Sequence, residues 1–446
     1  MVGIATSKNG NGSSWRGGMA GDHGPGETPT QELHSRLIAG LDLSRIGSMS
    51  DEEIRAEIRE AAADLCNRSS SLLTAGDRER LVAEVMDEAF GLGPLESLLR
   101  DATISDILVN GPQTVYVERK GRLELTDVTF GSEQHLLQII QRIVGRVGRR
   151  VDETTPMVDA RLADGSRVNA IIPPLALDGS LLCIRRFSAH ALKADDLIAK
   201  QSVAKEMVEF LAGCVAARRN ILISGGTGSG KTTLLNMLSG YIPHDERIAT
   251  IEDAAELRLQ QRHVVRMETR PANVEGQGLV TSRDLVRNAL RMRPDRVVIG
   301  ESRGPEALDM LQAMNTGHDG SMTTLHANDT RDALSRLEMM VGMAGFDMPM
   351  WVIRKQISSA VHIVVQAARL TGGVRKITKI SEITGMEGEI ISMHDLFVFK
   401  QTGLDADRVA EGYFVSTGIR PKCLEHLEIQ GIHLPPEMFE GKTLTF

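Results

Sequence analysis

Aromatic residues, positive charge and long apolar runs are in short supply in this chain. Phe, Trp and Tyr together make up 3% of its 446 residues, which leaves few rings that could stack on the bases of a nucleic acid. The formal net charge is -8 at pH 7, whereas proteins that coat nucleic acids or anionic membranes carry an excess of positive charge. We therefore expect no nucleic-acid partner, although a local basic patch is compatible with this composition.

Cysteine pairs and membrane-spanning runs are also lacking. The four cysteines, Cys66, Cys183, Cys214 and Cys423, are far apart and form no Cys-x-x-Cys pair, so neither a zinc site nor a disulfide framework is indicated. Residues 1–30 contain no apolar segment of the kind that marks a signal peptide. No run approaches the roughly 18 to 20 apolar residues that span a bilayer. The expected location is the cytoplasm.

The first hundred or so residues predict a tail followed by helices. A chain of 446 residues exceeds what one hydrophobic core usually supports, so we expect two or three domains. Residues 1–30 are mostly Gly, Ser, Thr and Pro and indicate a disordered tail. Within residues 31–100, apolar side chains recur at helical spacing, for example at Leu81, Val85 and Ala89. This pattern predicts an N-terminal helical region.

The remainder of the chain predicts two domains of different type. Residues 101–190 contain strand-like runs broken by turn signals at Asn110-Gly111 and Asp164-Gly165, with an amphipathic helix between them, and so indicate a small α+β domain. A polar linker is expected over 191–200. Over 201–446 strands and helices alternate, which favours an α/β domain with a parallel sheet.

A glycine-rich segment after the apolar run "ILIS" has the full P-loop pattern, Gly-x-x-x-x-Gly-Lys-Thr. Glycines allow backbone N–H groups to point inward at phosphate oxygens, and the helix that follows adds the positive end of its dipole. We expect Lys231 to reach the β- and γ-phosphates of ATP and Thr232 to reach Mg²⁺. The predicted nucleotide-binding residues of this loop are Gly225, Gly226, Thr227, Gly228, Ser229, Gly230, Lys231, Thr232 and Thr233.

Carboxylates follow two later strands of the same domain. The segment "RIATIEDAAEL" places Glu252 at the end of a strand and Glu256 one turn later, and "RPDRVVIGESRG" places Glu301 after a second strand. Ligands of an open parallel sheet bind beyond the carboxyl ends of its strands. We therefore expect Glu301 to hold Mg²⁺, and either Glu252 or Glu256 to activate the attacking water.

Two histidines form a further candidate group in "NTGHDGSMTTLHANDT". The run "SMTTLHA" is similar to a strand that delivers His326 to the same edge of the sheet, where an imidazole could contact the γ-phosphate. His318 precedes that strand. We predict both histidines to be catalytic residues at the edge of the site.

Four segments resemble, in order, the boxes of secretion ATPases. "GGTGSGKTT", "TIEDAAEL", "LRMRPDRVVIGESRG" and "AMNTGHDGSMTTLHAND" are similar to the Walker A, acidic, Walker B and His boxes of type II and type IV secretion and pilus motors. Outside them, "VDARLADGSRVNAIIPPLALDGS" and neighbouring segments resemble the CpaF/TadA type, the ATPase of tight-adherence (Flp) pilus assembly. One difference follows Glu301, where "SRG" stands in place of the "VRG" usual in this branch.

The resemblance implies an architecture and further site residues. Each subunit of a hexameric ring would contain a PAS-like N-terminal domain and a RecA-like ATPase domain, with ATP between them and near the neighbouring subunit. The resemblance also implies arginines of the N-terminal domain against the nucleotide, because a planar, permanently charged guanidinium offsets charge on the γ-phosphate. The candidates are Arg161, Arg167, Arg185 and Arg186.

The expected function is that of a motor. We predict a cytoplasmic hexameric ATPase at the inner face of the cytoplasmic membrane, which works on an inner-membrane platform protein to drive pilus assembly or secretion. A DNA-translocating ring ATPase is one alternative and would need a basic pore. A nucleotide-switched regulatory subunit without turnover is another, against which the intact Lys231, Glu252 and Glu301 argue.

Overall fold

The computed structural model describes residues 74–119, 121–186, 192–272 and 276–444, together with a few helical residues between 52 and 63. Two compact units divide the chain. One holds the residues up to Arg100 together with 128–142, and the other holds residues 101–127 and 143 onward. The tail predicted over 1–30 lies outside the described residues. The domain boundaries given by the sequence stay a prediction.

The first unit contains the helices predicted before residue 100. Helix α4 spans Ala75–Phe90 and α5 spans Leu95–Arg100. Helix α6, Glu133–Arg146, begins in this unit. His135 Nε2 of α6 lies 2.6 Å from Glu88 Oε1 of α4, and Arg142 Nη1 donates to the Glu88 carbonyl oxygen over the same distance. These contacts connect α4 and α6 within the unit.

A six-stranded antiparallel sheet forms from residues 104–185 of the second unit, in the order β3-β2-β1-β6-β5-β4. Both predicted turns are confirmed, because β1 turns into β2 after Asn110 and Gly165 adopts a positive φ of 93° in the β4–β5 hairpin. The strands are β1 Ile104–Asn110, β2 Val115–Arg119, β3 Arg122–Leu125, β4 Met157–Arg161, β5 Arg167–Ile171 and β6 Leu181–Arg185.

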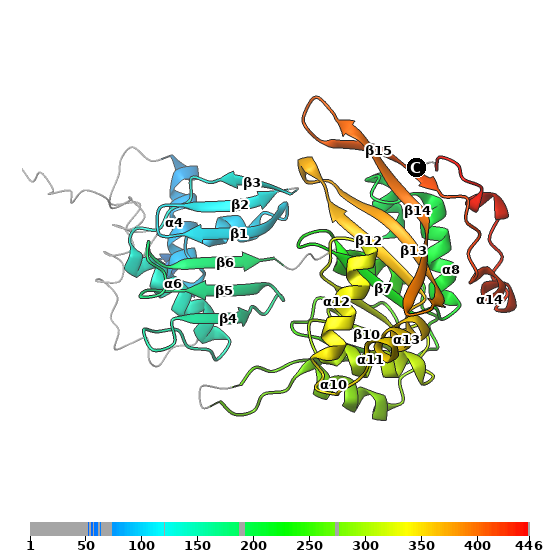
Figure 1. The fold of residues 1–446 in the computed structure, drawn as a ribbon. Helices are drawn as coiled ribbons and strands as arrows, with labels where there is room; N and C mark the ends of the chain where they lie inside the picture. Colours follow the sequence, from blue (N-terminus) through cyan, green and yellow to red (C-terminus); the bar gives the residue numbers. More distant parts are fainter. Residues whose placement is uncertain are drawn as a thin grey trace, which may run out of the picture. The chain divides into compact units, whose positions relative to one another are not determined.

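A nine-stranded mixed sheet forms the core of residues 221–416, in the order β15-β14-β13-β12-β7-β11-β10-β8-β9. The six strands from β12 to β9 run parallel, and β13, β14 and β15 extend the sheet antiparallel beyond β12 (Figure 1). Their bounds are β7 Ile221–Gly225, β8 Ile248–Glu252, β9 Val264–Glu268, β10 Arg296–Ile299, β11 Met322–Leu325, β12 Ile363–Arg369, β13 Arg375–Glu387, β14 Ile390–Leu404 and β15 Ala410–Ser416.

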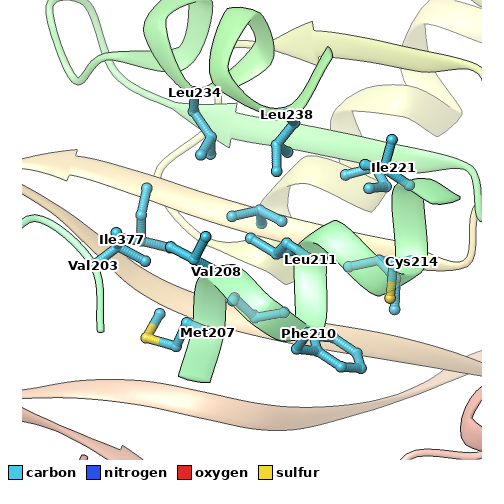
Figure 2. Packing of buried hydrophobic residues seen from close by; sticks show 14 of the residues in the cluster. Val203, Met207, Val208, Phe210, Leu211, Cys214, Ile221, Leu234, Leu238 and Ile377 are labelled. Carbon is cyan, nitrogen blue, oxygen red and sulfur yellow. The ribbon is translucent and has the colours of Figure 1, made fainter. Parts of the chain in front are cut away.

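Helices cover both faces of this sheet, which explains why β7, β8, β10 and β11 are buried along their whole length. Ile221 and Ile223 of β7 pack in one apolar cluster, whereas Leu222 between them packs in the other. Figure 2 shows Met207 and Phe210 gathered with Ile221 and Ile377 in the first cluster. The helices are α7 Ala194–Ala199, α8 Lys205–Ala216, α9 Lys231–Ser239, α10 Ser282–Ala289, α11 Glu306–Asn315, α12 Thr330–Gly342, α13 Met350–Ala360 and α14 Leu424–Ile429.

The predicted fold class is confirmed. From α8 to β12 the helices and strands build a parallel sheet, as predicted, and a small sheet with its own strand order precedes them. After β12 the alternation ends, because β13, β14 and β15 follow one another as antiparallel strands. The segment predicted as a linker contains the short helix α7. Because parallel strands end at one edge, β7, β8, β10 and β11 bring the segments after Gly225, Glu252, Ile299 and Leu325 to the same side of the sheet.

Candidate nucleotide-binding site

The loop between β7 and α9 has the geometry of a phosphate-binding loop. Gly228 and Gly230 have positive φ values of 69° and 97°, a region that glycine adopts without strain. A Cβ atom on Gly225 would lie 2.3 Å from the Ala367 carbonyl oxygen. Each of these positions therefore requires glycine, and the loop leads directly into the N-terminus of α9.

The ammonium group of Lys231 lies inside this loop. Its Nζ donates to the carbonyl oxygens of Gly225 and Gly226 at 3.0 and 3.1 Å, and it lies 3.4 Å from His326 Nε2. Burial lowers the pKa of Lys231, although neighbouring carboxylates favour its charged form. A buried cation with loop carbonyls as its partners is placed to bind phosphate oxygens.

Glu252 ends β8 with one carboxylate oxygen fixed and one without a partner. Its Oε1 accepts hydrogen bonds from the backbone N–H groups of Glu256 and Leu257, each 2.8 Å long. Its Oε2 is buried and has no hydrogen-bonding partner among the described residues. Burial raises the pKa of Glu252, while the two N–H groups act in the opposite direction. The arrangement suits a carboxylate that accepts a proton from water.

Glu301 follows β10 and lies between two basic side chains. His326 Nε2 lies 2.8 Å from Glu301 Oε1, and Arg303 Nη2 lies 2.7 Å from Glu301 Oε2. His326 comes directly after β11, at the carboxyl edge where the sequence predicted it. Burial lowers its pKa, although Glu301 favours the protonated ring. Glu301, His326 and Lys231 therefore form one contiguous group.

His318 lies elsewhere. It precedes β11 at the amino end of the strand, where its carbonyl oxygen accepts a hydrogen bond from Ser321 Oγ. The length of β11 separates it from the carboxyl edge, so the structure does not bring His318 to the phosphate loop. The position of His318 therefore gives no support to its predicted catalytic role.

Three of the four predicted arginines form a row across the six-stranded sheet. Arg161 pairs in register with Arg167, and Arg167 with Arg185, so their side chains share one face. Arg167 Nη2 donates to the Ala254 carbonyl oxygen at 2.8 Å, and its Nε lies 3.1 Å from Glu256 Oε1.

The outer members of the row have different partners. Arg161 Nη1 lies 2.7 Å from Glu268 Oε2, and Arg185 Nε lies 3.7 Å from Asp106 Oδ1. Arg186, the next residue along the chain, donates to the carbonyl oxygens of Asp101 and Ile104. Its guanidinium thus binds the backbone of its own domain.

The phosphate loop and three of the four predicted arginines, Arg167, Arg185 and Arg186, line a cavity of about 530 Å³. Arg161 and His318 are not part of its lining. Its lining includes residues 227–233 of the loop and α9, the candidate carboxylates and His326. It also includes basic residues that the sequence analysis did not single out, namely Arg258, Arg303 and Arg375. Arg375 Nε donates to the carbonyl oxygen of Gly228 at 2.8 Å. No spacing rule connects residues 228 and 375, so only the strand order of β7 and β12 with β13 could have revealed this contact.

The residues fit a nucleotide with Mg²⁺. Thr232 and Glu301 line the cavity, and the unpartnered Glu252 Oε2 is a buried polar atom that needs a donor or a cation. Within the described part of the chain no three His, Cys, Asp or Glu side chains group as a metal site. A metal here would therefore take most of its ligands from phosphate and water, which is usual for Mg²⁺ bound with a nucleotide.

The residue after Glu301 is buried without disturbing the site. Ser302 is 1% exposed, and its hydroxyl lies 2.9 Å from the hydroxyl of Thr323 on β11. Its backbone N–H donates to the Thr324 carbonyl oxygen at 2.8 Å. The small hydroxyl is thus satisfied by a neighbouring strand.

Several known proteins are similar to this chain in sequence. The sequence model of the family "Type II/IV secretion system protein" matches residues 88–405. A Mycobacterium tuberculosis (strain H37Rv) protein named for conjugal transfer is 38% identical over 323 residues, which cover 71% of this chain and 91% of that protein. The type IV secretion system protein VirB11 of Bartonella henselae is 30% identical over 65% of this chain and 91% of its own length.

Solved structures of two ATPases also match part of the chain. The VirB11 ATPase of Brucella suis, crystallised with sulphate, shows 29% identity, covers 66% of this chain and 97% of its own, and has a TM-score of 0.36. The ATPase DotB of Legionella pneumophila shows 21% identity, covers 68% and 82%, and has a TM-score of 0.46. Among the described residues of the present chain, no helix combines the length and apolar character needed to cross a membrane.

Proposed function

This chain belongs to the type II/IV secretion system protein family, and on that basis we propose that it is a Mg²⁺-dependent ATPase that drives pilus assembly or secretion as a hexameric ring. The observation that supports hydrolysis is the convergence of Lys231, Glu252 and Glu301 on one cavity with the phosphate loop. Binding alone needs the loop and Lys231, whereas Glu252 and Glu301 are the groups that turnover requires.

Each residue has a task in the proposed reaction. Backbone N–H groups of the loop and the start of α9 hold the phosphates, and Lys231 exchanges its carbonyl partners for phosphate oxygens. Thr232 and Glu301 would hold Mg²⁺, which would supply positive charge to the phosphates of the nucleotide. Glu252 orients water and accepts its proton through Oε2, while its Oε1 stays fixed by two N–H groups. Glu256 is the alternative base, but Arg167 pairs with it.

His326 and the arginine row would respond to the nucleotide. His326 lies against both Glu301 and Lys231, so any movement of these two on phosphate binding reaches its ring. Arg167, Arg185 and Arg186 line the same cavity, and the permanent charge of Arg167 and Arg185 suits the γ-phosphate. Arg161 is proposed to support the row through Glu268, and Arg186 to stabilise the backbone between Asp101 and Ile104.

We propose that the work is done on an inner-membrane platform protein, at the cytoplasmic face of the membrane, by subunits arranged in a ring. Support comes from the family and from the relatives named for type IV secretion and conjugal transfer. Tight-adherence pilus assembly is the proposed pathway, on the strength of the sequence resemblance. A DNA-translocating ring would instead show turnover that rises when DNA is added.

The test combines turnover with assembly. ATP hydrolysis is measured against protein concentration, with the mass determined in the same samples, for the wild type and Glu301→Gln. Turnover per subunit that rises as a six-subunit species forms, and disappears in Glu301→Gln while nucleotide binding persists, supports the proposal. Nucleotide binding without turnover in either protein points instead to a regulatory subunit, and turnover per subunit that does not depend on assembly contradicts the ring.

A further inference from the structure

Arg303 stands out because it contacts two carboxylates of the site at once. Its Nη2 lies 2.7 Å from Glu301 Oε2, and its Nη1 lies 3.3 Å from Asp253 Oδ2. The two terminal nitrogens of one guanidinium thus join the segment after β10 to the segment after β8. A guanidinium keeps its positive charge at any pH at which enzymes work, so both carboxylates face a permanent cation.

The backbone around Arg303 is fixed by a buried acid. Glu306 at the start of α11 is 7% exposed, and its Oε1 accepts hydrogen bonds from the N–H groups of Arg303 and Gly304 at 2.6 and 2.9 Å. The preceding residue, Ser302, is held by Thr324 of β11. Only the side chain of Arg303 is therefore left to adjust, and it projects from a rigid base.

Asp253, the second carboxylate that Arg303 contacts, has further partners outside the ion pair. Asp253 Oδ1 lies 3.3 Å from Thr269 Oγ1, just past β9, and 3.3 Å from Ser282 Oγ at the start of α10. Asp253 therefore connects Arg303 to the two ends of the segment between β9 and α10. A displacement of Thr269 or Ser282 would reach Glu301 through Asp253 and Arg303.

We propose that Arg303 is a positioning residue that holds Glu301 in register with Asp253 and limits how far the Glu301 carboxylate is available to Mg²⁺. The proposal rests on the ATPase function proposed above. Glu301 Oε2 can face either the guanidinium or a metal ion, since both compete for the same lone pairs. With Arg303 in place, Glu301 keeps one orientation. Without Arg303, the Glu301 carboxylate would bind the metal ion more tightly, because no guanidinium competes for its oxygens. Its orientation would, however, no longer be fixed.

If Arg303 served only to stabilise the fold, its replacement would lower the unfolding temperature. The Arg303 side chain is 56% exposed, and ion pairs this exposed contribute little to the stability of a fold. Replacing Arg303 should therefore leave the unfolding temperature within experimental error of wild type. Its effect should instead show in metal binding and in turnover.

The experiment is a double-mutant cycle on metal binding. Binding of a fluorescent ATP analogue is titrated against Mg²⁺ for the wild type, Arg303→Gln, Glu301→Gln and the double variant. We expect Arg303→Gln to lower the half-saturating Mg²⁺ concentration by about two- to fivefold, the scale of one partly exposed ion pair, and to have no such effect when Glu301 is already Gln. If Arg303→Gln shifted the half-saturating Mg²⁺ concentration equally with Glu or with Gln at position 301, Arg303 would act through its positive charge alone and not through Glu301. That result would overturn the proposal.

Turnover supplies the second readout. We expect Arg303→Gln to lower kcat by about 10- to 100-fold with little change in KM, because a misplaced group costs chiefly in the reaction step. Arg303→Lys should stay near the value of Arg303→Gln, since one ammonium group cannot reach both carboxylates. A kcat of Arg303→Lys close to the wild-type value would show that contact with both carboxylates is not needed, and would overturn the proposal.

Two comparisons complete the design. Arg420→Gln is the matched control, because Arg420 is 73% exposed and pairs with Glu428 at 3.9 Å outside the cavity; it should match wild type throughout. A wild type that binds nucleotide without hydrolysing it would refute the proposed function, yet the Mg²⁺ cycle would still decide the link between Arg303 and Glu301.

Discussion

Replacement of Glu252 by glutamine separates the two candidate bases. Glutamine has nearly the same shape, and its carbonyl oxygen can still accept the N–H groups of Glu256 and Leu257 that now hold Oε1. The amide nitrogen then stands where Oε2 was, and it cannot accept a proton. The substitution therefore removes the proposed base while it leaves the end of β8 in place.

The magnitude follows from the task. A positioned general base contributes typically about 10²- to 10⁴-fold to a rate, so we expect kcat of Glu252→Gln to fall by that factor with nucleotide affinity nearly unchanged. Burial raises the pKa of Glu252 above the ordinary value of about 4.3. A base acts only when deprotonated, so wild-type turnover should rise with pH through this raised pKa. The acidic limb should be absent from the residual activity of Glu252→Gln.

The assay is steady-state ATP hydrolysis from pH 5 to 8, with nucleotide binding measured in parallel. Glu256→Gln is the matched comparison, because Glu256 lines the same cavity but pairs with Arg167. It should lose much less activity than Glu252→Gln. If Glu252→Gln kept a third or more of wild-type kcat while Glu256→Gln lost most of it, the roles assigned here would be reversed.

Three further outcomes are expected. Lys231→Ala should weaken nucleotide binding by about 10- to 100-fold in a binding titration, because a charged donor to phosphate is lost; unchanged affinity would refute its placement. His326→Gln should lower turnover, whereas His318→Gln, at the amino end of β11, should hydrolyse ATP like wild type. Glu246→Ala should cost about 3 to 5 kcal/mol in chemical denaturation, because it leaves Arg296, which is 0% exposed, without its carboxylate; the exposed Glu428→Ala is the control, and a cost below about 1 kcal/mol would contradict the argument.

The phosphate loop and the strand-end carboxylates could be predicted because they depend on local chemistry. Glycine is required at 225 because a Cβ atom would clash with a neighbouring carbonyl oxygen, and at 228 and 230 because φ is positive. Apolar runs of four or five residues indicate strands that are buried on both faces. Given parallel strands, the positions of Glu252 and Glu301 at one edge follow from topology alone. Which histidine reaches the site could be predicted only from the bounds of β11, because this strand separates His318 from His326.

The finer roles depended on contacts across the chain. Nothing local says that Glu252 Oε1 is held by two N–H groups while Oε2 is left without a partner. Likewise, Arg303 lies in the segment "RPDRVVIGESRG", whose spacing draws attention only to Glu301. Arg375 begins β13 and is far in sequence from all four motif segments. Their places are set by which strands are neighbours in the sheet, and sequence spacing carries no record of that order.

The charge of the cavity shows why an average over the chain can mislead. The whole chain carries a formal charge of -8, which argues against polyanionic partners. Yet seven Lys and Arg side chains line the cavity against four carboxylates. A polyphosphate entering it meets an excess of positive charge at short range, where low-dielectric walls strengthen the attraction. Glu256, Asp253 and Glu301 each pair with an arginine of the cavity, whereas Glu252 Oε2 has no hydrogen-bonding partner among the described residues. On the proposal above, a metal ion therefore competes with Arg303 for Glu301, while Glu252 stays available to accept a proton.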